Sequence, residues 1–443
     1  MTSRPKPINP ARFMVAGFIG LILTGSLMLS LPAAYFAEEF SYIDALFTAA
    51  SAVCVTGLVV VDTGTFFTPL GQAVIMFLIF AGSLGFMTMT TLIFVFLGRR
   101  ITLRDRLIVK EALNQESLAE LIPLVKTVIR VAVIFIMIGT ILLSLRFIPQ
   151  FGYGNGFFYA LFHAVSAFGN AGFDLFGHFE SLTRFPTDYL VNVTIMFLFI
   201  IGGLGFTVIL DLTRHLRYRS RLSLHSHLVL LITAFLLVGG AVLILILEHK
   251  NPATMGNLSS GAKIFTAFFT AATPRTAGFS VLDTGSLAYP TLIIMLAMMF
   301  IGASPTSTGG GVKTTTFAVV LLTVINMIRG RNEPVVFLHR ISLDQIMKAI
   351  SIVVGAVTLI FLATFCMTIF EDNNFMSLVF EVFSAFGTVG LSRGITADLS
   401  IPSKAALIVT MFGGRVGPLT LLVALARQKK GVLHFPEEHL LIG

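Results

Sequence analysis

The sequence predicts an all-α polytopic membrane protein, on three observations. Of the 443 residues, 56% are hydrophobic and only 12% are charged, which is about half the charge of a typical soluble domain. Mean hydropathy is +0.91, and several apolar runs exceed the roughly 20 residues that cross a bilayer as a helix. One short motif recurs four times along the chain. The net charge of +8 is then a matter of membrane topology rather than of nucleic-acid binding.

Eight apolar runs are long enough to span the membrane, and a shorter apolar stretch lies inside each successive pair. The predicted spans are 13–35, 70–97, 121–148, 188–212, 227–247, 291–328, 346–370 and 405–426. The shorter stretches are 42–55, 155–169, 262–273 and 375–387. They are too short to span, so we expect each to enter the membrane and return to the same side. Most Lys and Arg residues fall in the loops on the side of the N-terminus, so both termini are predicted to be cytoplasmic and the short stretches to open outward.

A glycine motif ends each of the short stretches. Each glycine has Phe ten residues before it and Leu or Phe after it, and three have Ser six residues before it. Each is separated from the next by 106 to 115 residues, and we call these four residues the motif glycines: Gly57, Gly172, Gly278 and Gly390. The recurrence of the same motif at nearly equal intervals predicts four fused repeats. Their bounds are 1–110, 111–222, 223–332 and 333–428, with a cytoplasmic tail at 429–443.

Further glycines recur in the second span of each repeat, and in the third repeat Gly302 is followed three residues later by Pro305 rather than by a second glycine. Pairs three residues apart stand at Gly82 and Gly85, at Gly202 and Gly205, and at Gly414 and Gly417. Small residues let membrane helices approach closely, so we expect the first two pairs to serve helix packing.

A chain that re-enters the membrane exposes backbone carbonyls at depth, which is tolerated only beside protein or a water-filled cavity. Four such loops around one axis would offer rings of carbonyl oxygens, which can replace the hydration shell of a monovalent cation. The short helices would point their partly negative C-terminal ends at that cation. The pattern therefore predicts a cation pathway.

With its four motif glycines and the short apolar stretches before them, the chain resembles the Trk/Ktr/HKT superfamily of potassium transporters over about residues 12–428. The resemblance implies four fused helix–pore loop–helix repeats, eight spans in all, around a pseudo-fourfold pore. With one span before the first loop, the chain looks most like the membrane subunits of Ktr uptake systems. A Ser at the first filter position goes with sodium transport in plant relatives, so Gly57 favours K⁺. The filter residues that carry over are Val55, Thr56, Gly57, Asn170, Ala171, Gly172, Thr276, Ala277, Gly278, Thr388, Val389 and Gly390.

The sixth span is too long for one straight helix and is interrupted at 302–316. Pro305 and the run from Gly309 to Gly311 should break it. The segment resembles the intramembrane gate loop of the family, although two helices joined by a cytoplasmic loop are an alternative. Its spacing does not match a phosphate-binding loop. The gate residues implied are Gly302, Ser304, Pro305, Thr306, Gly309, Gly310, Gly311, Lys313 and Arg415.

Two basic residues, Lys313 and Arg415, lie at positions predicted to be within the membrane, and a third, Arg275, lies in the third filter loop. Arg415 is in the middle of a span, where a charge costs at least about 2.5 kcal/mol. The resemblance implies a barrier below the filter, and an ion pair with a loop acid is the alternative. Lys313 could plug the path or reach toward the cytoplasm. Arg275 should point behind its loop toward an acid. Asp62, Asp174 and Asp283 follow their glycines closely, as charges at the mouth or as solvated turns.

The resemblance also implies the partners and the cellular setting. It implies a homodimer in the lipid of the bacterial plasma membrane, bound to a cytosolic KtrA-like regulatory ring that binds nucleotide. The basic loops and the tail 429–443 are the predicted docking face of that ring. K⁺ would be the transported ion, with dependence on Na⁺ left open, and we expect no organic cofactor, no nucleic acid and no enzyme activity. The rival hypotheses are a secondary transporter of Na⁺ or of a small solute with discontinuous helices, and an integral-membrane enzyme.

Overall fold

The computed structural model describes residues 10–85, 121–330, 335–337 and 339–425, and in these the chain is helical apart from one small hairpin. Four of the described helices are long and apolar enough to cross a membrane, or six if each sharply bent pair counts as one span. The predicted all-helical membrane protein is confirmed. The second half of the predicted span 70–97, the loop at 99–110 and the tail 429–443 lie outside the described residues.

The first half of the chain contains two of the short stretches, and each is a helix that ends just before its motif glycine. The helices of this half are α1 (Pro10–Leu29), α2 (Tyr42–Cys54), α3 (Thr63–Phe66), α4 (Pro69–Leu84), α7 (Leu121–Phe151), α8 (Tyr153–Gly169), α9 (Tyr189–Leu204) and α10 (Phe206–Tyr218), with a 3₁₀ turn at Pro32–Ala34. Helix α4 begins with Pro69 behind an N-cap in which Thr68 accepts from the Gly71 amide, a favourable start for a helix.

The second half repeats the same order of a long helix, a short helix and a second helix. Its helices are α11 (Leu224–Glu248), α12 (Ser260–Ala272), α13 (Tyr289–Phe300), α14 (Thr314–Ile328), α15 (Leu343–Phe370), α16 (Phe375–Gly387), α17 (Ile401–Val416) and α18 (Pro418–Leu425). Strands β1 (Val335–Val336) and β2 (His339–Arg340) form the antiparallel hairpin between α14 and α15. Two 3₁₀ turns stand at Thr284–Ser286 and Thr396–Asp398.

The predicted spans 188–212 and 405–426 each consist of two helices rather than one, because the chain bends at the second glycine of each pair. Helices α9 and α10 meet at 98°, and α17 and α18 meet at 97°. Gly205 and Gly417 both have φ of 93°, a left-handed backbone that glycine adopts without steric cost and that ends a helix. Gly85 ends α4 with φ of 80°. The packing interpretation is right for Gly82 and Gly202, since a Cβ on either would lie 2.1 Å from a short-helix carbonyl oxygen.

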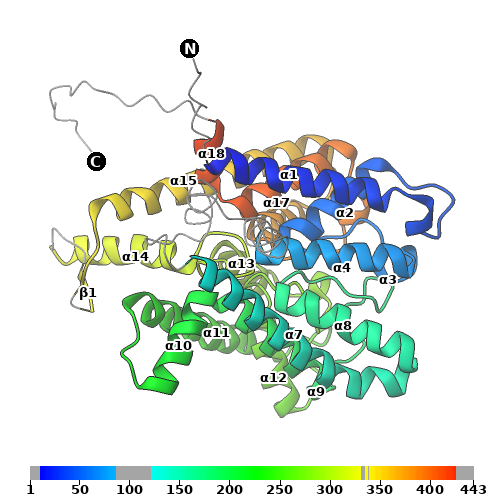
Figure 1. Cartoon of the computed structure of the whole chain (residues 1–443), viewed down its shortest axis with the longest axis horizontal. Helices are drawn as coiled ribbons and strands as arrows, with labels where there is room; N and C mark the ends of the chain where they lie inside the picture. Colours follow the sequence, from blue (N-terminus) through cyan, green and yellow to red (C-terminus); the bar gives the residue numbers. More distant parts are fainter. Residues whose placement is uncertain (1–9, 86–120, 331–334, 338, 426–443) are drawn as a thin grey trace.

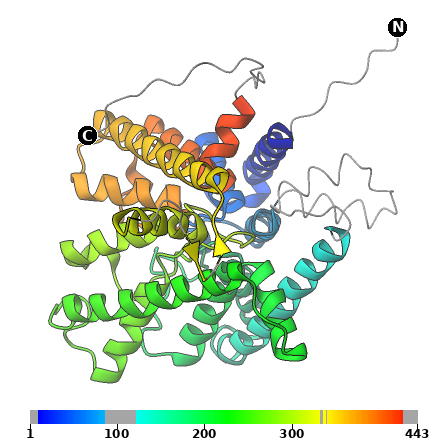
Figure 2. The same ribbon diagram turned by 90° about the vertical axis from the view of Figure 1, so that its left-hand side faces the viewer.

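The four sets of helices follow one another around a common centre in sequence order, which the colours make visible in Figure 2. The short helices α2, α8, α12 and α16 are largely buried in their second halves, and the first three are labelled in Figure 1. Three of the motif phenylalanines, Phe47, Phe162 and Phe380, are fully buried, and Phe268 is partly buried. Burial of these rings fixes the depth of the short helices and therefore brings the four motif loops together.

Candidate functional site

The backbone two residues before each motif glycine is left-handed although each residue there carries a side chain. In the first, second and fourth loops, the second amide after the short helix bonds back to a carbonyl of that helix, for example Thr56 N to Ser51 O at 2.8 Å and Val389 N to Ser384 O at 2.8 Å. A positive φ is a genuine outlier for a β-branched residue and costs about 1–3 kcal/mol. The four residues and their φ values are Val55 (59°), Asn170 (61°), Thr276 (68°) and Thr388 (50°).

Each motif glycine packs against the motif loop of the next repeat, and the four loops close a ring. A Cβ on Gly57 would lie 2.2 Å from the Ala171 carbonyl oxygen, and a Cβ on Gly172 would lie 2.9 Å from Gly278 Cα. A Cβ on Gly278 would lie 2.4 Å from Val389 O, and one on Gly390 would lie 2.2 Å from Thr56 O. Each glycine therefore faces the loop that follows it in the chain, and the last faces the first. All four have positive φ, between 68° and 90°, so a side chain is excluded by both conformation and space.

Hydroxyl groups on the short helices hold the motif loops in two different ways. In the first and fourth loops the hydroxyls of Ser51 and Ser384 accept from the motif glycine amide at 3.0 Å. In the second and third loops the hydroxyls of Ser166 and Thr273 donate to the carbonyl of the residue after the glycine, at 2.7 and 2.6 Å. The hydroxyls are buried, and each satisfies a loop group that would otherwise lack a partner.

Two ionisable residues on the short helices, each nine residues before its motif glycine, bond to the segment that follows that glycine. Glu381 on α16 is fully buried and accepts from the Ser392 hydroxyl at 2.6 Å, the Arg393 amide at 3.0 Å and the Thr396 hydroxyl at 3.0 Å. His163, at the same place on α8, is engaged at both ring nitrogens, with Tyr159 O at 2.7 Å and the Leu175 amide at 3.3 Å. Glu381 was not among the predicted site residues, although a carboxylate within an apolar helix is a signal for such a role.

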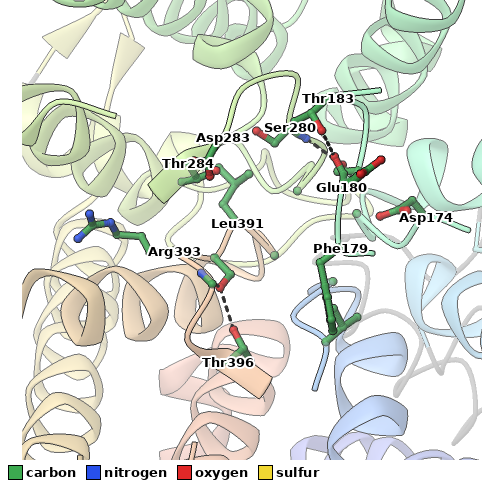
Figure 3. A pocket seen from close by; sticks show the side chains of 18 of the residues that line it. Asp174, Phe179, Glu180, Thr183, Ser280, Asp283, Thr284, Leu391, Arg393 and Thr396 are labelled. Atoms are coloured by element: carbon green, nitrogen blue, oxygen red, sulfur yellow. Dashed lines mark hydrogen bonds between the residues drawn. The ribbon is translucent and has the colours of Figure 1, made fainter. Parts of the chain in front are cut away.

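A cavity of about 430 Å³ opens above the ring, and all four motif glycines line it. Asp174 and Glu180 lie on one side of it, and Arg393 lies on the other (Figure 3). Burial, and then the nearby negative charges of Asp62 and Glu180, raise the pKa of Asp174 to about 7. Asp283 also lines the cavity, and both Asp62 and Asp283 accept from turn amides. Asp174 and Asp283 therefore line the cavity, Asp283 while also supporting a turn, whereas Asp62 supports turns.

The interrupted segment between α13 and α14 forms a loop directly beneath the ring, and we call residues 301–313 the inner loop. Its backbone bonds to the second helices on either side, from Ser304 N to Gly203 O at 3.1 Å and from Gly311 N to Gly414 O at 3.1 Å. Gly310 N donates to the Thr388 hydroxyl at 2.9 Å, and a Cβ on Gly309 would lie 2.0 Å from Thr276 Oγ1. The inner loop therefore fills the space under two of the motif loops.

Arg415 fastens the inner loop to the opposite side of the molecule. Its guanidinium donates to the carbonyls of Thr308 in the inner loop and Gly82 at the end of α4, and to Ser83 O at 3.1 Å. No carboxylate contacts it among the described residues, so the expected ion-pair alternative is not found there. Arg415 is half-buried, and a guanidinium with several carbonyl acceptors has much of its hydrogen-bonding capacity satisfied.

The other two basic residues differ from Arg415 and from each other. The Lys313 ammonium donates to Gly309 O at 2.6 Å, so it crosslinks the inner loop, a contact that neither sequence alternative included. Arg275 is 7% exposed and its Nε has no partner in the described part of the chain. The expected acid partner of Arg275 is not found there.

Pro305 and Thr306 extend the inner loop to the bend at Gly205. The Phe206 amide donates to Thr306 O at 3.0 Å, and the Thr207 and Thr306 hydroxyls lie 3.0 Å apart.

In the motif loops, the side chains of Asn170 and Thr276 are 3.0 Å apart. The amide orientation in which the Asn170 oxygen accepts from Thr276 also lets its nitrogen reach Ala167 O and Phe199 O. The structure thus brings the sequence-predicted residues into two adjoining layers.

Comparison with known proteins agrees with this geometry. A family model described as a cation transport protein, TrkH, matches residues 14–431. The Ktr system potassium uptake protein B of Bacillus subtilis is 44% identical over 98% of this chain and 97% of its own length. The protein of the same name from Vibrio alginolyticus is 42% identical over 98% and 94%. The potassium/sodium uptake protein NtpJ of Enterococcus hirae is 38% identical over 99% and 98%.

A solved structure is similar in fold. The crystal structure of the potassium transporter TrkH from Vibrio parahaemolyticus superimposes with a TM-score of 0.74 at 18% identity, covering 96% of this chain and 87% of that one. At this identity the likeness concerns the fold alone. The family match nearly spans the chain and is a match to transporters, not to enzymes. This chain is therefore a member of the TrkH family of cation transport proteins.

Proposed function

We propose that this chain is the translocating subunit of a potassium uptake system. The observation that carries the proposal is the closed ring of four motif glycines beneath an outward cavity. Loops held by left-handed backbone at the end of short helices can direct carbonyl oxygens at an ion on the axis. The names of the similar proteins in Bacillus subtilis and Vibrio alginolyticus support K⁺ as that ion.

The arrangement proposed is four fused repeats forming eight spans around a pseudo-fourfold pore, with boundaries at 1–110, 111–222, 223–332 and 333–428. The cyclic contacts among the motif glycines support it, because each repeat meets the next and the fourth meets the first. The filter is assigned to the three residues that end at each motif glycine. K⁺ would bind their backbone carbonyls, as the transported ion rather than as a resident cofactor.

The inner loop and Arg415 are proposed as the gate. The loop lies under Thr276 and Thr388, and Arg415 ties it to α4 by carbonyl contacts. Flow would require these contacts to open. The gate then comprises Gly302, Ser304, Pro305, Thr306, Gly309, Gly310, Gly311, Lys313 and Arg415.

The assembly is proposed to be a homodimer in a bacterial plasma membrane, with both termini cytoplasmic. A cytosolic KtrA-like ring that binds nucleotide would control the gate from that side. The word "system" in the names of the relatives supports such a partner. Na⁺ enters the proposal as a second relevant cation because one relative is named a potassium/sodium uptake protein.

The test is cation-resolved uptake by the purified protein in liposomes, with K⁺ and Na⁺ measured separately and with Na⁺ present or absent. We expect K⁺ uptake that follows the electrochemical gradient, and loss of discrimination in Gly278→Ser. The matched control is Gly394→Ser, where φ is also positive, 88°, but no atom lies within 4 Å of the added Cβ. Solute uptake without cation selectivity, or unchanged selectivity in Gly278→Ser, would instead support a secondary transporter built on the bent helices.

A further inference from the structure

Helix α10 departs from the direction of the membrane spans. It follows α9 through the 98° bend at Gly205, and Figure 1 shows it turned across the neighbouring α11. Helix α9 begins just after Thr183, which lines the outer cavity. Its 16 residues rise about 24 Å, close to the roughly 30 Å of the hydrocarbon core. Helix α10 therefore starts on the inner side of the bilayer, level with the inner loop that its Phe206 amide contacts, and runs across the direction of the spans.

The end of α10 and the turn after it carry a dense basic cluster. Its members are Arg214, Arg217, Arg219 and Arg221, which are all exposed. Among the described residues none of the four forms a salt bridge. The nearby carboxylate, Asp211, is occupied by the Ser223 amide at 2.9 Å and the Ser226 hydroxyl at 2.6 Å. Arg214 interacts electrostatically with Asp211, so the positive charge of the cluster is only partly balanced within the described part of the chain.

Apolar and aromatic side chains are interleaved with these arginines. Leu216 is 76% exposed and Tyr218 is 69% exposed, while Phe206 and Val208 at the start of the helix are buried. The Arg217 guanidinium lies 5.4 Å from the centre of the Tyr218 ring. Basic residues beside exposed Leu and Tyr are typical of a helix that lies in the interfacial plane, with its rings at headgroup depth.

We propose that α10 and the turn to Arg221 form a binding surface for anionic phospholipid headgroups of the inner leaflet. The four arginines bind the phosphates, for which the guanidinium fork is suited. Leu216 and Tyr218 enter the boundary between headgroups and acyl chains. This basic loop was among those predicted to dock the regulatory ring. A lipid surface is favoured here because the charges and the exposed apolar groups share one short helix on the inner side of the bilayer. This inference is independent of the ion that the protein carries.

The absence of tryptophan from the chain allows a direct test with Tyr218→Trp as the single fluorescent reporter. The variant is reconstituted in phosphatidylcholine vesicles that contain an equal mole fraction of brominated phosphatidylglycerol or brominated phosphatidylcholine. We expect quenching to be about twofold stronger with the brominated anionic lipid, because the arginines enrich it locally. Neutralising the cluster as R214Q/R217Q/R219Q/R221Q in the same background should remove the difference.

Two controls make the outcome specific. The matched reporter is Phe235→Trp, on the lipid-exposed middle of α11, which should be quenched equally by both lipids. The variant R214K/R217K/R219K/R221K should keep most of the preference, since it keeps the charge. Equal quenching at position 218 by both lipids would overturn the proposal. So would a water-like emission that no lipid quenches, which would leave the helix free for a cytosolic protein.

Discussion

The ring of motif glycines and the inner loop beneath it are built on opposite principles. The ring uses the same device four times, a short helix, a left-handed residue and a glycine, so that each loop contacts the next. The inner loop occurs once, in the third repeat, and is held by groups of all the others, including Thr388, Gly203 and the α4 carbonyls reached by Arg415. Coordination of an ion on an axis needs equivalent ligands from every side, whereas one segment is enough to obstruct a path.

The largest expected effect comes from breaking the ring. In Gly390→Ala the methyl group would lie 2.2 Å from Thr56 O at a φ of 90°, and left-handed backbone alone costs about 1–2 kcal/mol for a residue with Cβ. We expect K⁺ uptake to fall by about a hundredfold or more, as the clash and the strain add. Liposome flux measures this.

The control for that variant is Gly394→Ala, at φ of 88° in open space. It carries the backbone strain without the clash, and it should retain most of its uptake. Equal loss in both variants would contradict the importance of the contact between loops.

The next largest effect is expected at Arg415, which holds the inner loop in place beneath the ring. Arg415→Ala removes the contacts to Thr308, Gly82 and Ser83. Hydrogen bonds from a charged group contribute about 1.5–3 kcal/mol, so we expect the background cation leak to rise about tenfold or more. The leak is measured as efflux from loaded liposomes without a regulatory partner.

Arg415→Lys then separates charge from attachment, because lysine keeps the charge but loses the planar fork. If the lysine variant leaks as much as the alanine variant, attachment of the inner loop is the barrier. No change of leak in either variant would remove Arg415 from the gate.

A smaller effect is expected at Glu381, which supports the fourth motif loop and whose counterpart in the second repeat is His163. Glu381→Gln replaces an acceptor of three hydrogen bonds by an amide that cannot accept all of them. We expect a severalfold loss of K⁺ over Na⁺ selectivity, because the segment 392–396 that follows the fourth motif glycine would shift. We also expect the free energy of unfolding to fall by about 1–3 kcal/mol.

The matched control is Glu371→Gln, whose carboxylate accepts from the Ser400 amide and hydroxyl at 2.8 and 2.7 Å, away from the motif loops. It should lose stability without losing selectivity. If both variants change selectivity alike, Glu381 has no special role behind the filter.

The smallest effect lies outside both regions, at the mouth. The pKa of Asp174 is raised to about 7 by burial and by the neighbouring acids, so the carboxylate is ionised above that pH and neutral below it. We expect K⁺ uptake at low concentration to fall about twofold as the pH drops through 7, as the mouth loses its attraction for cations. Asp174→Asn should abolish this step in the pH profile.

Stability should change in the opposite direction. A carboxyl whose folded pKa is raised is most favourable when protonated, so its contribution to stability falls as the pH rises from about 4 toward 7. Asp174→Asn should therefore melt higher than the wild type at pH 8. A lower melting temperature there would contradict the raised pKa.

Much of the fold followed from periodicity and repetition. The four short helices end within one or two residues of the predicted stretches, because long apolar runs and a fixed distance to glycine leave little choice of depth. The bends at Gly205 and Gly417 were not predicted. A glycine in an apolar run can pack a helix or end it, and only the neighbouring backbone decides. Pro305 stands where the other second helices carry that glycine, so the interruption at 302–316 was visible in the sequence.

The sequence by itself determined that the chain is a helical membrane protein with four glycine motifs, because bilayer thickness and backbone sterics act on local patterns. It also marked Arg415 and Pro305 as exceptions. Tertiary structure alone decided the partners: Arg415 holds carbonyls rather than an acid, Glu381 braces the loop after its own short helix, and each glycine meets the next loop. These contacts join residues up to hundreds of positions apart, and their energies depend on distances that no local pattern encodes.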